Sequence, residues 1–251
     1  MVQLFALEGI PPVVAGDDLA KLTVDALELA ELQLQPADVL VFAQKVVSKA
    51  EGRRVDLATV TPGERALELA RTVGKDPRLV ELVLRESRRI VRTAKDVLIV
   101  EHRLGLIMAN AGIDQSNVHE DGNFALLLPE DPDGSAGRLR TRLGELTSVQ
   151  PGVIISDSFG RPWRVGTVGV AIGCAGVASI IDMRGKPDMF GRPLRVTVIG
   201  HGDEIAAAAS LLMGQADEAR PVVLVRGLAS TSAKAKPASA LLRPPETDLF
   251  R

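Results

Sequence analysis

The spacing of apolar residues changes repeatedly along this chain, and this change constrains the fold more than any other feature. Runs typical of strands cover 2–6, 39–47, 153–156, 194–200 and 221–226. Helical spacing covers 18–34, 135–146 and 203–213, and a hairpin is expected over 97–100 and 106–109. Because strands and helices do not alternate in a steady βαβ rhythm, we predict an α+β fold with more than one mixed sheet rather than a Rossmann fold.

Two further helices are indicated by their ends. Thr61-Pro62-Gly63-Glu64 has the form of a capping box with proline at the first helical position, and Gly74 would close this helix after Val73. Asp76-Pro77 is expected to start the next helix, which would end near Ser87.

The length of 251 residues fits one large domain or two modest ones. We assign residues 1–228 to one domain, with a division into two subdomains left open. The segment 229–240 is rich in Ala, Ser and Lys, so we expect residues 229–251 to form a flexible C-terminal tail.

The longest uncharged run, 165–181, contains four glycines. A membrane helix needs about 20 mostly apolar residues, so this run is interpreted as buried strand and tight turn. The first residues lack the basic start and long apolar stretch of a secretory signal, and the single cysteine, Cys174, excludes an internal disulfide framework. We therefore expect a cytoplasmic protein that does not enter a membrane.

The composition argues against a nucleic-acid-binding protein. Thirty basic residues stand against 32 acidic ones, and the aromatic residues are six Phe, one Trp and no Tyr. Such a chain has neither a broad basic surface nor many rings for base stacking. It also lacks a helix-flanked Gly-x-Gly-x-x-Gly and a Gly-x(4)-Gly-Lys-Ser/Thr loop, so any nucleotide would be bound by another route.

Two polar stretches follow predicted strands. Asp114 and Asn117 can direct oxygens toward a hard cation such as Mg²⁺ or Mn²⁺, although such residues also stabilise turns on their own. Asp157 and Ser158 follow a buried strand, where ligand sites often lie, and Arg161 could face phosphate oxygens. A nucleophilic role for Ser158 is disfavoured because no Gly-x-Ser-x-Gly elbow is present.

Two other stretches allow both a functional and an ordinary structural interpretation. Lys45 and Lys49 lie at the end of the predicted strand 39–47 and could meet phosphate as point charges, or be surface lysines of an edge strand. Gly214 follows the predicted helix 203–213, where its simplest role is a C-cap.

Eight short stretches occur along the chain in this order: Glu8-Gly9-Ile10-Pro11 with Gly16-Asp17-Asp18-Leu19, Val47-Ser48-Lys49-Ala50-Glu51-Gly52, Asn110-Ala111-Gly112-Ile113-Asp114 with Ser116-Asn117-Val118, Leu127-Leu128-Pro129 with Asp131-Pro132-Asp133-Gly134-Ser135, Asp157-Ser158-Phe159-Gly160-Arg161, Asp203-Glu204-Ile205-Ala206-Ala207, Leu212-Met213-Gly214, and Val225-Arg226-Gly227-Leu228. No single stretch is decisive. In this order and spacing, however, they resemble the coenzyme F420:L-glutamate ligase family over nearly the whole chain.

This resemblance implies a ligase that adds L-glutamate to the carboxylate of the deazaflavin precursor coenzyme F420-0. GTP would be the co-substrate, an acyl phosphate the intermediate, and further rounds would extend a γ-linked tail. The resemblance also implies two sites for Mg²⁺ or Mn²⁺, with K⁺ as a further candidate ion, and an intertwined homodimer with the site in a groove between subunits.

Site residues can be carried over by position. Asp114 and Asp157 would hold one metal ion, Ser158 and Gln215 would contact a second, and Arg161 joins the two aspartates as a candidate catalytic residue. The GTP site would be lined by Ile10, Pro11, Pro12, Val13, Gln44, Lys45, Lys49, Asn117 and the turn from Met213 to Arg220, in particular Met213, Gly214, Gln215 and Ala216. The family often has an acidic residue near Gln215 and threonine at the position of Ser158, so this chain offers a neutral oxygen at the first position and keeps a hydroxyl at the second.

Two other functions stay open. A metal-dependent nucleotide phosphohydrolase could use the same Asp114 and Asp157 without glutamate or a deazaflavin. A non-catalytic nucleotide-binding module could have kept the fold, and the missing carboxylate at Gln215 is the reason to consider it.

Overall fold

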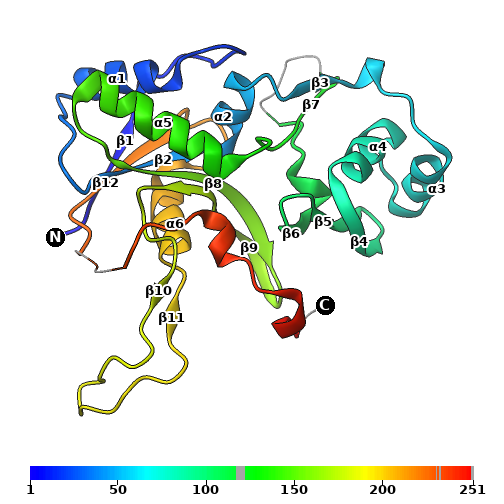
Figure 1. The fold of residues 1–251 in the computed structure, drawn as a ribbon. Helices are drawn as coiled ribbons and strands as arrows, with labels where there is room; N and C mark the ends of the chain where they lie inside the picture. Colours follow the sequence, from blue (N-terminus) through cyan, green and yellow to red (C-terminus); the bar gives the residue numbers. More distant parts are fainter. Residues whose placement is uncertain (117–121, 230, 232, 250–251) are drawn as a thin grey trace.

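A computed structural model of the chain describes residues 1–116, 122–229, 231 and 233–249. Its centre is a five-stranded sheet in the order β1-β12-β2-β8-β9 (Figure 1). The strands are β1 (Gln3–Leu7), β12 (Val222–Arg226), β2 (Val39–Ala43), β8 (Gly152–Arg161) and β9 (Arg164–Ala175). β2 and β8 pair in parallel, whereas the other neighbouring strands are antiparallel. The prediction of an α+β fold with mixed sheets is therefore confirmed.

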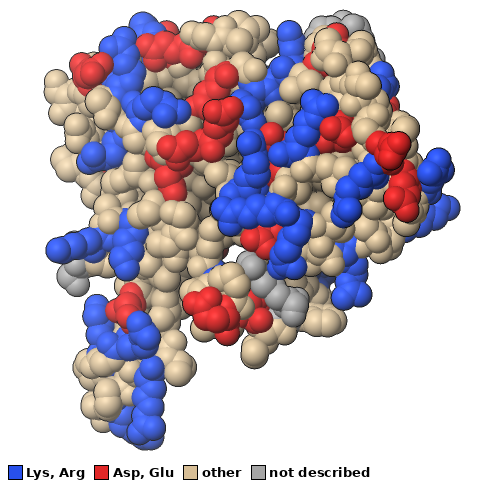
Figure 2. Space-filling model, turned by 45° about the vertical axis from the view of Figure 1, so that its right-hand side comes forward, with Lys and Arg blue, Asp and Glu red and all other residues tan. Residues whose placement is uncertain are grey.

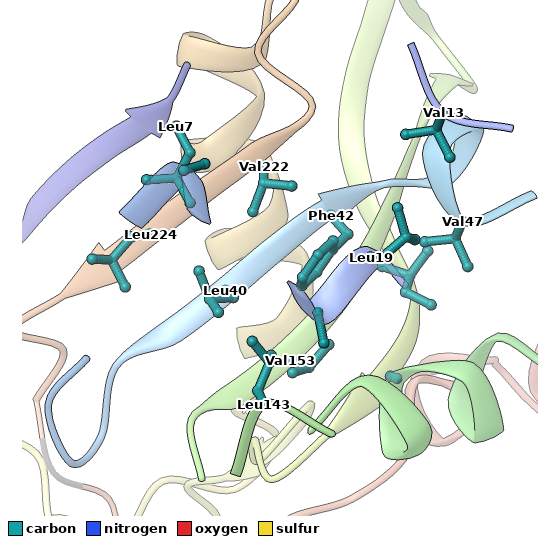
Figure 3. Packing of buried hydrophobic residues seen from close by; sticks show 14 of the residues in the cluster. Leu7, Val13, Leu19, Leu40, Phe42, Val47, Leu143, Val153, Val222 and Leu224 are labelled. Atoms are coloured by element: carbon teal, nitrogen blue, oxygen red, sulfur yellow. The ribbon is translucent and has the colours of Figure 1, made fainter. Parts of the chain in front are cut away.

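Different helices cover the two faces of this sheet. The helices are α1 (Leu19–Leu29), α5 (Pro132–Thr147) and α6 (His201–Met213). Along β2, Leu40 and Phe42 belong to the buried cluster that contains α1 and α5 (Figure 3). Val39 and Val41 belong instead to the cluster that contains α6. This alternation is the period of two that sends successive strand residues to opposite faces.

A second lobe, residues 57–113, has a buried apolar cluster of its own, to which Ala125 and Leu127 also contribute. It contains α3 (Glu64–Val73), α4 (Pro77–Arg85) and a sheet of β4 (Ser87–Ala94), β5 (Val97–His102) and β6 (Ile107–Ala109). β5 and β6 form the predicted hairpin, while β4 was not expected. A small pair, β3 (Arg54–Asp56) with β7 (Phe124–Leu126), lies where the chain enters and leaves this lobe.

Two predicted element boundaries are wrong because tertiary contacts override local propensity. The strand predicted over 39–47 ends at Ala43, and α2 (Gln44–Ala50) follows. Val47 packs in the main core from this helix. Its intrinsic preference for strands therefore does not determine the local structure. The capping box at Thr61 does not form either, because α3 begins at Glu64 and the Gly63 amide donates to Glu81 Oε2 at 3.1 Å.

Two predicted irregular or extended segments also differ. The loop expected after residue 156 is the continuation of β8, which forms a long hairpin with β9. The strand expected over 194–200 is reduced to β11 (Val198–Ile199), which pairs with β10 (Ile181–Asp182). Residues 181–199, hereafter the arm, project from the body of the protein (Figure 1).

Part of the C-terminal segment contacts the body of the protein. The Asp133 carboxylate accepts hydrogen bonds from the backbone amides of Ala238 (2.7 Å) and Cys174 (2.8 Å). The amide of Lys236 donates to the Val177 carbonyl at 2.9 Å. The flexibility of residues 229–251 stays a prediction, and these contacts locate the point at which the segment is attached.

Among the described residues, no helix combines the length and the apolar character needed to cross a membrane.

Candidate functional site

A pocket of about 410 Å³ opens beside the end of β2, between α2, β8, β9 and the turn that follows α6. Its lining includes most of the predicted site: Ile10, Pro11, Pro12, Val13, Gln44, Lys45, Lys49, Asp157, Ser158, Met213, Gly214, Gln215 and Ala216. These residues come from four separate stretches of the sequence, and the sheet brings them together. Parallel pairing of β2 with β8 sets the end of β2, where α2 begins, beside Ser156 and Asp157.

Lys45 lies at the centre of the polar contacts. Its Nζ is 2.7 Å from Asp114 Oδ2 and donates to Ser116 Oγ at 2.9 Å. The amide of Ser116 in turn donates to Asp114 Oδ1 at 2.7 Å. Burial alone would raise the pKa of Asp114, but the hydrogen bonds from Lys45 and Ser116 lower it. Asp114 is therefore ionised and already paired with a cation of the chain itself.

The segment before Asp114 has an unusual backbone. Asn110, Ala111 and Gly112 have φ values of 51°, 54° and 66°. Glycine and, to a lesser degree, asparagine tolerate left-handed conformations, whereas alanine does not, so Ala111 is the strained residue of the three. Such strain often occurs where a backbone positions a functional side chain, and here it leads directly to Asp114.

Asp157 differs from Asp114 although both face the same region. Burial raises the pKa of Asp157 to about 7, and the nearby charge of Asp114 also raises it, while the Ser158 amide and the charge of Lys45 act in the opposite direction. The Ser158 amide donates to Asp157 Oδ1 at 2.8 Å. A carboxylate placed against another carboxylate in a partly buried pocket is stabilised by any cation that can reach it.

Two side chains of α2 complete this wall. The side-chain amide of Gln44 donates through Nε2 to Ser48 Oγ at 2.8 Å, so the Gln44 side chain is held in place by its own helix. Burial lowers the pKa of Lys49, and the positive charges of Lys45 and Arg54 lower it further. Because the two lysines are four residues apart on a helix, they lie on the same side of it and present two positive charges to the pocket.

Other predicted residues have different outcomes. Asn117 lies outside the described residues. Arg161, at the far end of β8, is not among the residues that line the pocket, and its buried Nη1 has no hydrogen-bond partner in the described part of the chain. Its catalytic role stays a prediction.

The pocket also contains residues that sequence reasoning did not assign. Ser156 Oγ lies 3.8 Å from the sulfur of Met213, and Gly169 and Ser210 join the lining from β9 and α6. A Cβ at Gly169 would lie 2.6 Å from the Ala206 carbonyl oxygen, so this glycine permits β9 and α6 to approach. No local sequence pattern marks such a contact between distant elements.

The donors fit a hard cation that keeps part of its own coordination shell. Asp114, Asp157, Ser158 and Gln215 offer carboxylate, hydroxyl and amide oxygens, which suit Mg²⁺ or Mn²⁺. In the ranges that the structure describes, no group of three or more His, Cys, Asp or Glu side chains could hold a metal ion. Water or substrate oxygens would therefore have to supply the remaining ligands, as Mg²⁺ commonly requires.

Comparison with known proteins accounts for this arrangement. Residues 9–227 match the model of a protein family described as F420-0:Gamma-glutamyl ligase. The chain belongs to this family. The match includes the second lobe, the residues that line the pocket and every strand of the central sheet except β1.

Individual relatives in the ligase family are similar over almost their whole length. The coenzyme F420:L-glutamate ligase of Methanothermobacter thermautotrophicus is 47% identical over 254 residues, covering 100% of this chain and 99% of that protein. The protein of the same name from Methanopyrus kandleri is 48% identical, with 94% and 92% covered. The one from Haloarcula marismortui is 40% identical, with 100% and 96% covered.

Proposed function

We propose that this protein is a GTP- and metal-dependent ligase that joins L-glutamate to the carboxylate of coenzyme F420-0. The observation that carries the proposal is a pocket lined by Asp157 and by two lysines of α2, one of which pairs with Asp114, in a chain of the F420-0:gamma-glutamyl ligase family. The relatives' names supply glutamate and coenzyme F420 as substrates, and the charges of the pocket suit a nucleoside triphosphate and a metal ion. The choice of GTP follows from the family resemblance.

The reaction would occur in two balanced steps. A carboxylate oxygen of F420-0 attacks the γ-phosphorus of GTP, which forms an acyl phosphate and releases GDP. The amino nitrogen of glutamate then attacks the acyl carbon, phosphate leaves, and the nitrogen loses a proton as the amide forms. Neither step needs a nucleophile from the protein. Catalysis then depends on positioning and on stabilising charge.

The chain's own residues have separable roles in this proposal. Lys45 and Lys49 would neutralise phosphate oxygens as point charges. Asp114 and Asp157 would hold a Mg²⁺ or Mn²⁺ ion, with the Ser158 hydroxyl and the Gln215 amide as donors to a second. When bound, such ions supply charge neutralisation at the phosphates. K⁺ is a further candidate ion of the same site.

The direct test is mass spectrometry of F420-0 incubated with the purified protein, GTP, Mn²⁺ and L-glutamate. The proposal expects a product heavier by one or more glutamyl units, which disappears when GTP, metal or glutamate is left out, and which ATP does not support equally. Release of phosphate without a heavier product would show a phosphohydrolase instead. Binding of GTP with no turnover would show a non-catalytic module.

We also propose a homodimer, supported by apolar side chains on two hairpins. On the arm, Met189 is 97% and Phe190 is 80% exposed; at the tip of the β8–β9 hairpin, Trp163 is 88% exposed. Lys and Arg dominate the charged residues of the arm, at the lower left of Figure 2. Light scattering should give twice the chain mass of 26.7 kDa, and Phe190→Ser should weaken the dimer. A wild-type monomer at micromolar concentration would contradict the proposal.

A further inference from the structure

The turn after α6, residues 214–218, is folded around the carboxylate of its own last residue. The Ala216 amide donates to Glu218 Oε2 at 2.8 Å. The amides of Ala216, Glu218 and Gln215 all stabilise the ionised carboxylate, and together with Arg220 they lower the pKa of Glu218. Gly214 has a φ of 72°, and a side chain there would collide with the same carboxylate.

This geometry is that of an anion-binding turn. Successive backbone amides that converge on one point form a concave site for an anion, and the small residue beside them allows the anion to approach the backbone. In this structure the anion is internal. The carboxylate of Glu218 takes the place that an oxygen of an anionic ligand would otherwise occupy.

The turn is also a wall of the pocket described above. Gly214, Ala216 and Glu218 line that pocket together with Lys45 and Lys49 of α2. A phosphate group in this pocket is therefore surrounded by residues of the turn as well as by the two lysines. The negative charge of Glu218 opposes its entry.

We propose that Glu218 is an internal competitor that occupies the anion-binding turn and that a phosphate group of the nucleotide displaces it. Glu218 thus lowers the affinity of the pocket for polyphosphates. The identity of the ligand as a nucleotide rests on the proposed function, whereas the competition between a carboxylate and a polyphosphate rests on the turn itself.

Replacement by glutamine isolates this role. Glu218→Gln keeps an oxygen that can accept the Ala216 hydrogen bond, so the turn can keep its fold, but it removes the charge that the amides hold most strongly. Hydrogen bonds to charged groups are stronger than those to neutral groups. Asp217→Asn is the matched control, because Asp217 lies next to Glu218, lines the same pocket and carries the same charge.

Isothermal titration calorimetry of the full chain with inorganic tripolyphosphate, and then with GTP and Mg²⁺, tests the proposal. Glu218→Gln should lower the Kd for tripolyphosphate by about tenfold relative to the wild type. Most of this increase in affinity should remain at high salt. Asp217→Asn should lower it by about threefold or less and lose the gain at high salt. An unchanged or weaker affinity of Glu218→Gln, an equal gain from both variants, or no tripolyphosphate binding would overturn the proposal.

Ligation assays on the same proteins separate this inference from the proposed function. If the wild-type chain makes no glutamyl product but Glu218→Gln still gains affinity for tripolyphosphate, the proposed function fails and the competition stands. If the wild-type chain ligates, Glu218→Gln should lower the KM for GTP more than it changes kcat. Ligation with no change in KM or in the Kd would refute the competition alone.

Discussion

Two carboxylates in the two lobes of this protein have opposite electrostatic environments. Glu86, in the second lobe, lies 2.8 Å from Arg103, 3.1 Å from Arg53 and 3.6 Å from His102. Burial alone would raise the pKa of Glu86, but the contacts with His102 and Arg103 and the charge of Arg53 lower it to about 2. This carboxylate is fully matched by the chain itself.

Asp157 in the pocket is not matched in this way. Burial and the charge of Asp114 raise its pKa to about 7, while the cation that could have lowered it further, Lys45, is paired with Asp114. The same carboxylate chemistry therefore has two different consequences in the two lobes. A carboxylate surrounded by its own cations stabilises a fold, whereas one left beside another carboxylate attracts a cation from outside.

The largest expected effect follows from removing the charge of Asp157. Asp157→Asn should reduce ligation by at least about 10²–10³-fold, because a metal ligand that acts on the phosphates is lost. At the same time it should raise the free energy of unfolding of the metal-free protein at pH 8, by about 4 kcal/mol, because no charge is then desolvated. Product assays measure the loss of ligation, and urea denaturation measures the gain in stability. A variant that ligates normally would remove the metal assignment.

The opposite pattern is expected at Glu86. Glu86→Gln should destabilise the protein by about 3 kcal/mol, because Arg53 and Arg103 lose the carboxylate that pairs with both. Ligation per folded molecule should change little, since these residues do not line the pocket. Hydrogen exchange should show the loss concentrated in residues 57–113. Equal stability of this variant and the wild type would show that the pairing of Glu86 does not stabilise the second lobe, which contradicts the contrast with Asp157.

The pH dependence of stability should separate the two groups. Glu86 has a folded pKa of about 2 against an ordinary 4.5, so its stabilisation is present above pH 4.5 and is lost as the pH falls toward 2. Asp157 has a folded pKa of about 7 against 3.8, so its protonated form favours folding below pH 3.8 and this advantage is lost as the pH rises to 7.

The difference in unfolding free energy between the wild type and each variant, measured as a function of pH, shows these two pH ranges. Between pH 3.8 and 7 the metal-free wild type should lose about 1.4 kcal/mol per pH unit relative to Asp157→Asn, with no further loss above pH 7. The gap between the wild type and Glu86→Gln should open between pH 2 and 4.5 and then stay constant. Parallel curves for the two variants would contradict both assignments.

A smaller effect is expected where β9 meets α6. Gly169→Ala places a Cβ against the Ala206 carbonyl and Ser210, and the resulting shift should cost about 1–3 kcal/mol and raise the KM of the nucleotide. Gly160→Ala is the control on the same hairpin, because no atom of the described residues lies within 4 Å of its added Cβ. Equal behaviour of the two variants would show that the β9–α6 contact does not shape the pocket.

The sequence predicted those helices and strands in which a regular spacing of apolar residues coincides with a buried face. The first and last strands, the hairpin of the second lobe and the helix 203–213 are found close to the expected bounds. The predictions failed where a contact with a distant part of the chain determines the secondary structure. Val46 and Val47 favour a strand by themselves, but the core places Val47 on a helix. Asp157 and Ser158 have the polarity of a loop, yet they pair with β9 within a strand.

The candidate site could be predicted only as separate stretches. The resemblance named most of the residues that line the pocket, because ligand-binding residues follow short motifs. The roles of Gly169 and Ser210 could not be predicted, since they depend on the approach of β9 to α6. Nor could the opposite pKa shifts of Asp114 and Asp157, because burial raises the pKa of Asp157 whereas hydrogen bonds from Lys45 and Ser116 lower that of Asp114.

The most direct test of this account is the pKa of Asp157, measured by ¹³C NMR titration of its carboxyl carbon with and without Mg²⁺. We predict a pKa near 7 in the metal-free protein and a value at least about two units lower when Mg²⁺ is present. A metal-free pKa near 4 that Mg²⁺ does not change would contradict the assignment of Asp157 as a metal ligand, because Asp157 would then be an ordinary carboxylate with no need of a cation.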